Sequence, residues 1–183
     1  HSKHILLQET VSESNQEFDK LDDIQEYISQ KDREWISAPK DEITPFMQGI
    51  ISSDLSNSLR QEFIDFYESK YGYKIYLEIF LTNKYGANVA QTQKTSDYRQ
   101  DDEEWWQTAK ESGFYVGNVA YDESVNAYAI SIGVRVKNEN GDFIGIIKGV
   151  ISSSEIIREI KITTRKYKTT EIRLINEEGN LVY

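Results

Sequence analysis

Hydrophobic positions in the first fifth of the chain recur with the period of a helix. Between residues 5 and 36 they fall three or four positions apart, and acidic side chains hold the opposite face. The pattern predicts one long helix with a narrow apolar stripe, which consists of Leu7, Val11, Phe18, Leu21, Ile24 and Ile28. A narrow stripe interrupted by polar residues suits either packing along a sheet or pairing with a second copy of the chain. We favour the pairing, which predicts a homodimer through this helix.

A proline ends this helix, and the hydrophobic period then changes. Residues 54–70 have a helical period again. From residue 75 the period is two, and it predicts strands over 75–81, 87–92, 114–121, 127–136 and 143–151. Turns at Gly86 and Gly141 would join neighbouring strands, and a short helix ending at Gly113 would separate the second strand from the third. This order predicts an α+β fold, in which helices flank an antiparallel sheet.

The predicted strand 127–136 has two unlike faces. One face carries large apolar residues, namely Tyr128, Ile130, Ile132, Val134 and Val136. The other face is small and partly polar, and it consists of Ala127, Ala129, Ser131, Gly133 and Arg135. Short side chains on this face predict room above the sheet for something other than side chains.

Aromatic, carboxylate and amide side chains crowd most closely in residues 95–107. Asp101 is expected to cap the short helix, with Glu104 completing a capping-box spacing. The adjacent Trp105 and Trp106 point about 100° apart on a helix. We therefore expect one indole to pack against the sheet and the other to line a cleft or a loop. The stretch predicts a ligand site beside the small face of the sheet.

The candidate ligand residues combine aromatic walls with a few polar groups that would orient a small molecule. They are Tyr98, Gln100, Trp105, Trp106, Tyr115, Tyr121, Asp122, Tyr128, Ser131 and Arg135. Each could instead belong to the sheet surface, and for any single tyrosine that is the stronger interpretation.

Charge and composition exclude several other functions. The chain has 31 acidic and 21 basic residues, and the basic ones are scattered, so nucleic acid is not an expected partner. There is no cysteine, and both histidines, His1 and His4, lie at the beginning of the chain. No nucleophile or phosphate-binding motif occurs, so we expect no catalysis and no cofactor. Asp97, Asp101 and Asp102 could hold calcium, but their spacing matches no EF-hand loop, and we expect no metal site.

The end of the chain repeats part of its middle. A closing helix is predicted to begin at Ser152. Beyond it, five residues match the predicted 79–89 hairpin at a constant offset of 93 residues: Ile172, Leu174, Asn176, Gly179 and Val182. Strand-forming residues can match by chance, but the fixed register favours a duplicated module. We therefore divide the chain into an N-terminal helical region (3–70), a sheet module (71–162), and a linker with the start of a second module (163–183).

Several motifs resemble the Cache family of extracytoplasmic sensor domains, which have a PAS-like fold. The resemblance covers nearly the whole chain, and its motifs lie at residues 81–92, 97–98, 102–106, 121–122 and 141–150. It implies the ectodomain of a prokaryotic sensor histidine kinase or chemoreceptor, with transmembrane anchors outside this sequence. It also implies a small-molecule ligand between the sheet and the loops flanking the short helix. The alternative is a structural or dimerisation stalk that binds no ligand of its own.

One motif departs from the branch of this family that binds amino acids. In that branch an arginine stands one residue before a tryptophan-tyrosine pair and binds the ligand carboxylate. Here Glu103 takes the place of the arginine, and Trp106 takes the place of the tyrosine. With acidic residues and aromatic rings together, we expect an amine, a quaternary ammonium or a neutral polar ligand rather than a simple carboxylic acid.

Overall fold

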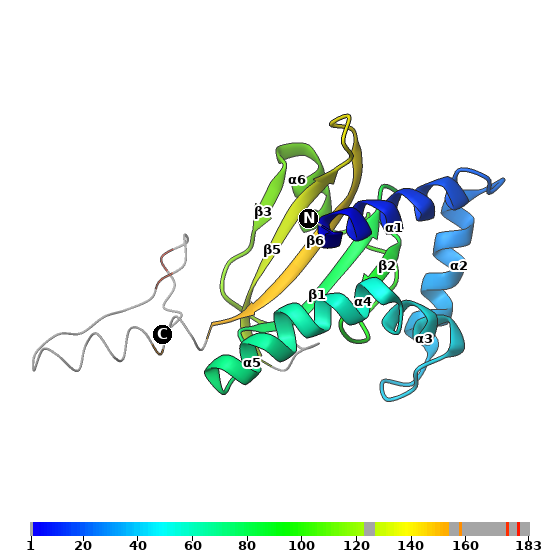
Figure 1. The fold of residues 1–183 in the computed structure, drawn as a ribbon. Helices are drawn as coiled ribbons and strands as arrows, with labels where there is room; N and C mark the ends of the chain where they lie inside the picture. The colour runs from blue at the N-terminus through cyan, green and yellow to red at the C-terminus, as the bar shows by residue number, and fades with distance from the viewer. Residues whose placement is uncertain (1, 123–126, 154–157, 159–174, 176–178, 180–183) are drawn as a thin grey trace, which may run out of the picture.

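One antiparallel sheet with helices on both faces forms the body of the protein. The computed structural model describes residues 2–122 and 127–153 together with residues 158, 175 and 179. The sheet order is β2-β1-β6-β5-β3 (Figure 1). Strand β4 also pairs with β5. The strands are β1 Tyr76–Asn83, β2 Asn88–Gln91, β3 Phe114–Val116, β4 Ala120–Asp122, β5 Ala127–Lys137 and β6 Phe143–Ser152. The predicted α+β fold is confirmed.

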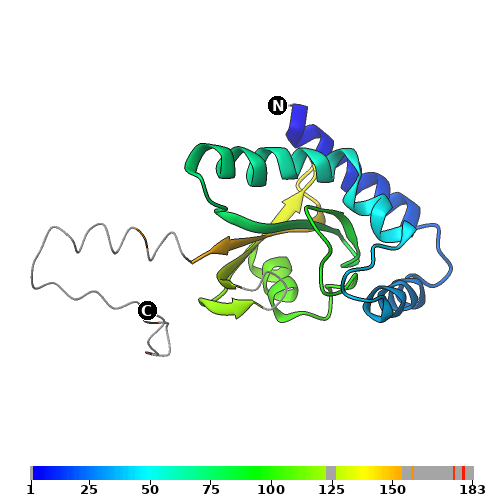
Figure 2. The ribbon, with the colours of Figure 1, turned by 90° about the horizontal axis from the view of Figure 1, so that it is seen from below.

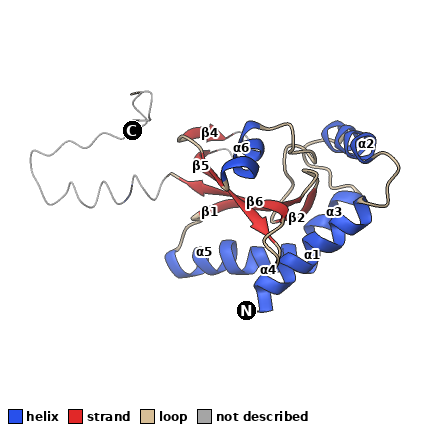
Figure 3. Cartoon of the chain, turned by 90° about the horizontal axis from the view of Figure 1, so that it is seen from above, coloured by secondary structure: helices blue, strands red, loops and turns tan. Residues whose placement is uncertain are grey.

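The helices lie in two groups. Their bounds are α1 Ser2–Phe18, α2 Ile24–Ser37, α3 Pro45–Ile51, α4 Asp54–Leu59, α5 Phe66–Tyr71 and α6 Glu104–Ser112, with a π-helical segment, Arg60–Asp65, between α4 and α5. Figures 2 and 3 show α1, α4 and α5 on one side of the sheet and α2 and α6 on the other. Among the described residues no helix is long and apolar enough to cross a membrane.

The predicted helix over residues 5–36 is two helices. Helix α1 ends at Phe18, and α2 begins after Asp23, whose side chain accepts a hydrogen bond from the Glu26 amide at 2.9 Å. Asp19, next to Phe18, is held by the Lys84 side chain. An aspartate that accepts from a backbone amide, as Asp23 does, favours the start of a new helix, so the chain breaks over residues 19–23 although the apolar period continues through them.

The apolar stripe of the N-terminal region packs inside the domain. Val11 is fully buried against Leu55 and Leu59 of α4 and against Ile79 and Leu81 of β1. Further along, Phe18 and Ile28 join Trp35 and Met47 in a second cluster. The interpretation of this stripe as a dimer seam is therefore wrong, and packing along the sheet is correct. Residues of α1 and α4 thus share a hydrophobic cluster with residues of β1.

The remaining predicted elements agree with the structure except in detail. The helix over 54–70 forms, but its middle is the π-helical segment. The predicted strand 114–121 is interrupted after Val116 and continues as β4. Gly86 and Gly141 have φ of 85° and 88°, as their turns require. Ser152 is the last residue of β6, and the predicted closing helix and the repeated hairpin lie largely outside the described residues.

Replacing Val11 with alanine tests the packing of α1. The change leaves a cavity between α1 and the sheet, so we expect the free energy of unfolding to fall by about 2 kcal/mol. Glu13→Ala, an exposed change on the same helix, is the control and should alter stability by less than about 0.5 kcal/mol. Chemical denaturation measures both, and equal stability of the two variants would show that α1 does not belong to this core.

Candidate functional site

Helix α6 lies against one face of the sheet and brings both neighbouring tryptophans to it. It begins after Glu103 and ends at Gly113, which has φ of 94°. The expectation that Asp101 caps it is wrong, because the Asp101 carboxylate instead accepts a hydrogen bond from Arg99 Nε at 2.7 Å. Asp101 therefore fixes the loop before α6.

Both tryptophans are buried, whereas the sequence predicts that only one of them packs against the sheet. Trp106 is 1% exposed and donates from Nε1 to the Thr82 hydroxyl of β1 at 2.9 Å. Trp105 meets the Phe80 ring edge to face at 5.7 Å. A Cβ at Gly133 would lie 3.2 Å from the Trp105 ring, so this glycine lets the indole lie directly on β5. The room predicted above Gly133 is filled by Trp105.

Cross-strand register shows which side chains share the face under α6, since directly paired residues project from the same side. The first row consists of Phe80, Lys148, Gly133 and Tyr115, and the second of Glu78, Val150 and Ser131. Trp105 covers the first row. In the second row the short Ser131 side chain lies beside Val150, and along β5 its neighbours on this face are Ala129 and Gly133, so the small surface that the sequence predicts begins there.

Two charged residues on this face are absent from the predicted site. Lys148 lies with its ammonium 4.5 Å from the centre of the Trp105 ring and 5.4 Å from that of Phe80. Glu78 is only 3% exposed. In the sequence, Glu78 and Lys148 are each a polar residue in a strand where polar and apolar residues alternate. Only the sheet register shows that both lie on the face that α6 covers.

The other predicted site residues fall into separate environments. Tyr98 stacks on Trp35 at 5.9 Å and meets Phe46 edge to face, so it belongs to the core beside α2. Gln100 is buried and bonds Asp97. Arg135 donates to the Lys110 carbonyl near the end of α6 at 2.9 Å. Tyr128 is 57% exposed and projects from the opposite face of β5.

Five predicted residues lie close to the α6 face. Tyr115, Ser131 and Arg135 lie on it, and Trp105 and Trp106 form its cover. Tyr121 and Asp122 belong to β4, and Asp122 pairs with Ala127 of β5. The predicted set is therefore divided between this face, the α2 core and the outer surface.

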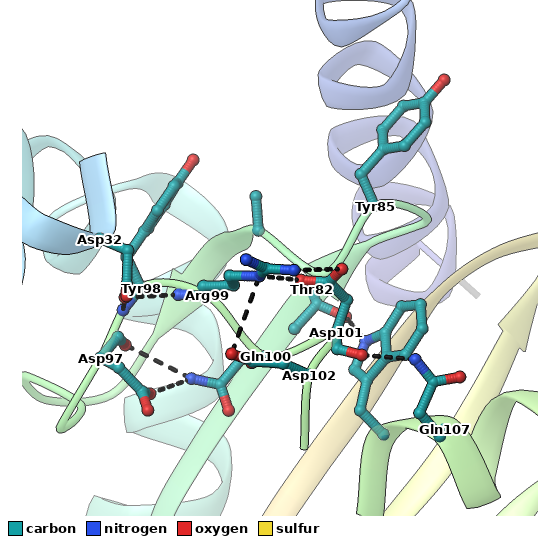
Figure 4. A network of polar contacts seen from close by, with 12 residues as sticks. Asp32, Thr82, Tyr85, Asp97, Tyr98, Arg99, Gln100, Asp101, Asp102 and Gln107 are labelled. Atoms are coloured by element: carbon teal, nitrogen blue, oxygen red, sulfur yellow. Dashed lines mark hydrogen bonds and ion pairs between the residues drawn. The ribbon is translucent and has the colours of Figure 1, made fainter. Parts of the chain in front are cut away.

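The loop that leads into α6 is fixed by α2. One carboxylate oxygen of Asp32 accepts from the backbone amides of Tyr98 and Arg99 at 2.9 and 3.0 Å (Figure 4). The Trp35 indole donates to the Thr95 carbonyl at 2.9 Å. The start of α6 thus depends on contacts with a helix more than sixty residues earlier in the chain.

Burial, helped by the nearby charges of Glu103 and Asp32, raises the pKa of Asp97 to about 6, although the hydrogen bond from Gln100 acts in the opposite direction. On the same side of the sheet, Gln91 is fully buried, and its Nε2 has no hydrogen-bond partner among the described residues. Such unsatisfied donors are rare in folded proteins.

Asp97 makes the stability of the domain depend on pH. The folded state keeps a proton on Asp97 up to about pH 6, whereas the unfolded chain loses it near 3.8. Its contribution to stability therefore falls as pH rises through this window. We expect Asp97→Asn to raise the melting temperature near neutral pH and to leave it almost unchanged near pH 4.

The exposed Asp102→Asn is the matched control, and scanning calorimetry at several pH values compares the two. A lower melting temperature for Asp97→Asn than for the unaltered protein near neutral pH would mean that the fold favours the charged carboxylate.

No protein-family model and no curated protein matches the chain in sequence. Solved structures resemble it in fold. The ligand-binding domain of the Campylobacter jejuni chemoreceptor Tlp3 in complex with L-norvaline is 17% identical, with a TM-score of 0.51, over 98% of this chain and 65% of that one. The ligand-binding domain of the Pseudomonas fluorescens chemoreceptor CtaA in complex with L-serine is 14% identical, with a TM-score of 0.51, over 88% and 65%.

The extracellular domain of a candidate histidine kinase, rpHK1S-Z16, is also similar. It is 12% identical with a TM-score of 0.50, and the match covers 99% of this chain and 66% of that one. The chain spans just under two thirds of the length of these three structures. The chain therefore has the fold of extracellular receptor sensor domains, as its sequence predicts.

Proposed function

We propose that this chain is the ligand-sensing domain of a membrane-anchored signalling receptor and acts on the extracytoplasmic face of the membrane. A sensor histidine kinase is the favoured receptor class, and a chemoreceptor is the other. The segment itself carries out no catalysis in this proposal. The fold supports it, and so do the motifs that resemble the Cache family.

One observation carries the proposal, namely the composition of the α6 face. A structural stalk would cover its sheet with apolar side chains. Here Lys148, buried Glu78 and buried Gln91 lie on the covered side of the sheet, and the short Ser131 side chain lies on the strand beside that of Lys148. Polar groups are costly to bury unless they serve recognition or have partners of their own. A small molecule bound between the sheet and α6 would use them.

A ligand collection separates a sensor from a stalk. We expect at least one small polar molecule to raise the melting temperature saturably, because a ligand that binds only the folded state stabilises it. Ser131→Leu should abolish this shift by filling the α6 face, whereas Val134→Leu, an exposed change on the other face of β5, should retain it. If no ligand gives a saturable shift, or if Ser131→Leu leaves it unchanged, a site on this face is excluded.

We further propose that the receptor pairs through the outward face of α1, since the inward face is occupied by the sheet. That outward face carries the half-exposed Ile5 followed by Glu9, Glu13 and Glu17 at four-residue spacing. Facing glutamates repel, so pairing would need the high local concentration that membrane anchors provide. We also propose that residues 163–183 are the start of a second module, because they repeat residues of the 79–89 hairpin at a constant offset.

The glutamates give this pairing a test. The isolated domain should be a monomer near neutral pH, and replacing all three glutamates with glutamine should increase its association in sedimentation experiments. The same exchange at Glu34, Glu42 and Glu62, which lie off α1, is the control. A triple variant that stays monomeric at the highest attainable concentration would argue against the α1 face.

A further inference from the structure

A cavity of about 390 Å³ lies between the end of α2 and the loop that follows β2. Its lining comes from two segments that are far apart in the sequence, namely Trp35, Ile36, Ala38 and Lys40 from the first and Lys94, Thr95 and Ser96 from the second. This volume falls within the range of about 300–1,000 Å³ that is typical of small-molecule sites. None of the described residues of the α6 face lines this cavity, so the two places are distinct.

Both charged residues in the described lining are lysines. Lys94 is fixed in place, because its ammonium donates to the carbonyls of Pro39 and Glu42 at 2.9 and 3.0 Å. An ammonium has three N–H donors, so the third N–H of Lys94 is available to another acceptor. Lys40 is exposed to solvent. The cavity therefore carries positive charge that is not balanced by an acidic residue among the described residues of its lining.

An apolar wall lies beside these cations. Ile36 is 61% exposed near the end of α2, and Ala38 follows the last residue of this helix. The buried Trp35 connects the two sides of the cavity, because its indole donates to the Thr95 carbonyl at 2.9 Å. An apolar wall with a few positioned polar groups is the usual composition of a small-molecule site.

We propose that this cavity binds a small carboxylate with an aromatic or branched apolar body. The carboxylate would accept from Lys94 and Lys40, and the apolar body would cover Ile36 and Ala38. An amine would meet two like charges here, and a neutral molecule would lack the charge-assisted hydrogen bonds that a carboxylate makes. This site is independent of a ligand on the α6 face. A bound molecule would join α2 to the loop that leads into α6.

The three tryptophans of the chain make the site observable. Each indole N–H gives its own NMR signal, and Trp35 is at this cavity, whereas Trp105 and Trp106 are on α6. Phenylacetate, indole-3-acetate and 4-methylpentanoate are the probes, and we expect at least one of them to shift the Trp35 signal saturably. Phenylacetamide, 2-phenylethylamine and inorganic phosphate should each bind at least about tenfold more weakly than the best acid.

Variants of exposed residues assign the contacts without disturbing the core. Ile36→Glu places a carboxylate on the cavity wall and should abolish the Trp35 shift, whereas Ile36→Leu should retain it. Lys40→Gln should weaken binding of the acid by about threefold, and Lys40→Arg should preserve it. Lys74→Gln removes an exposed cation between α5 and β1 and is the control, which should bind as the unaltered protein does. Melting temperatures show that each variant is folded.

The outcomes separate this cavity from the sensing function. The inference is overturned if none of the three acids shifts the Trp35 signal, or if phenylacetamide binds as tightly as phenylacetate. It also fails if Ile36→Glu leaves binding of the acid unchanged. A ligand that shifts only Trp105 and Trp106, and whose binding is lost in Ser131→Leu, would support sensing by the α6 face and count against a site at Trp35 for that ligand.

Discussion

The pairing of β6 on both of its edges holds the two halves of this protein together. Strand β6 pairs with β1 from Tyr76 to Asn83 on one edge and with β5 from Ala129 to Lys137 on the other. It does so although it follows every other described strand in the chain. Gly145 of β6 fits between α1 and β1, because a Cβ there would lie 3.1 Å from Val11 Cγ1. Without β6 the hairpin of β1 and β2 with its helices would have no contact through the sheet with β3, β4 and β5.

The two faces of the sheet differ in composition. Toward α1 and α4 the strands present Ile79, Leu81 and Ile144, and this face is a continuous apolar core. Toward α6 the same strands present Glu78, Thr82 and Lys148 beside aromatic rings. Stability is concentrated on the first face, so the second can carry polar groups at a tolerable cost.

Sequence patterns predicted the elements well because alternation and turn residues are local signals. They did not predict the end of α1, since Leu21 and Ile24 continue the apolar period across the break. They gave the buried stripe but not its partner, because a period shows that a face is covered and not what covers it. The burial of Trp106 depends on a hydroxyl acceptor 24 residues away, on Thr82. Lys148 reaches the candidate site through register alone, which no local pattern contains.

The turn between β1 and β2 imposes two requirements on one residue. Gly86 needs a positive φ, and its carbonyl accepts from the Gln100 amide at 2.9 Å, which brings Asp101 N to 2.6 Å from where a Cβ would lie. Asparagine, the residue that most readily replaces glycine at positive φ, would collide with that backbone. Distant relatives of this chain should therefore keep a glycine here even where overall identity is very low. A search profile weighted on this glycine, with Asn83 before it and the paired tryptophans after it, would distinguish them from other proteins built on similar sheets.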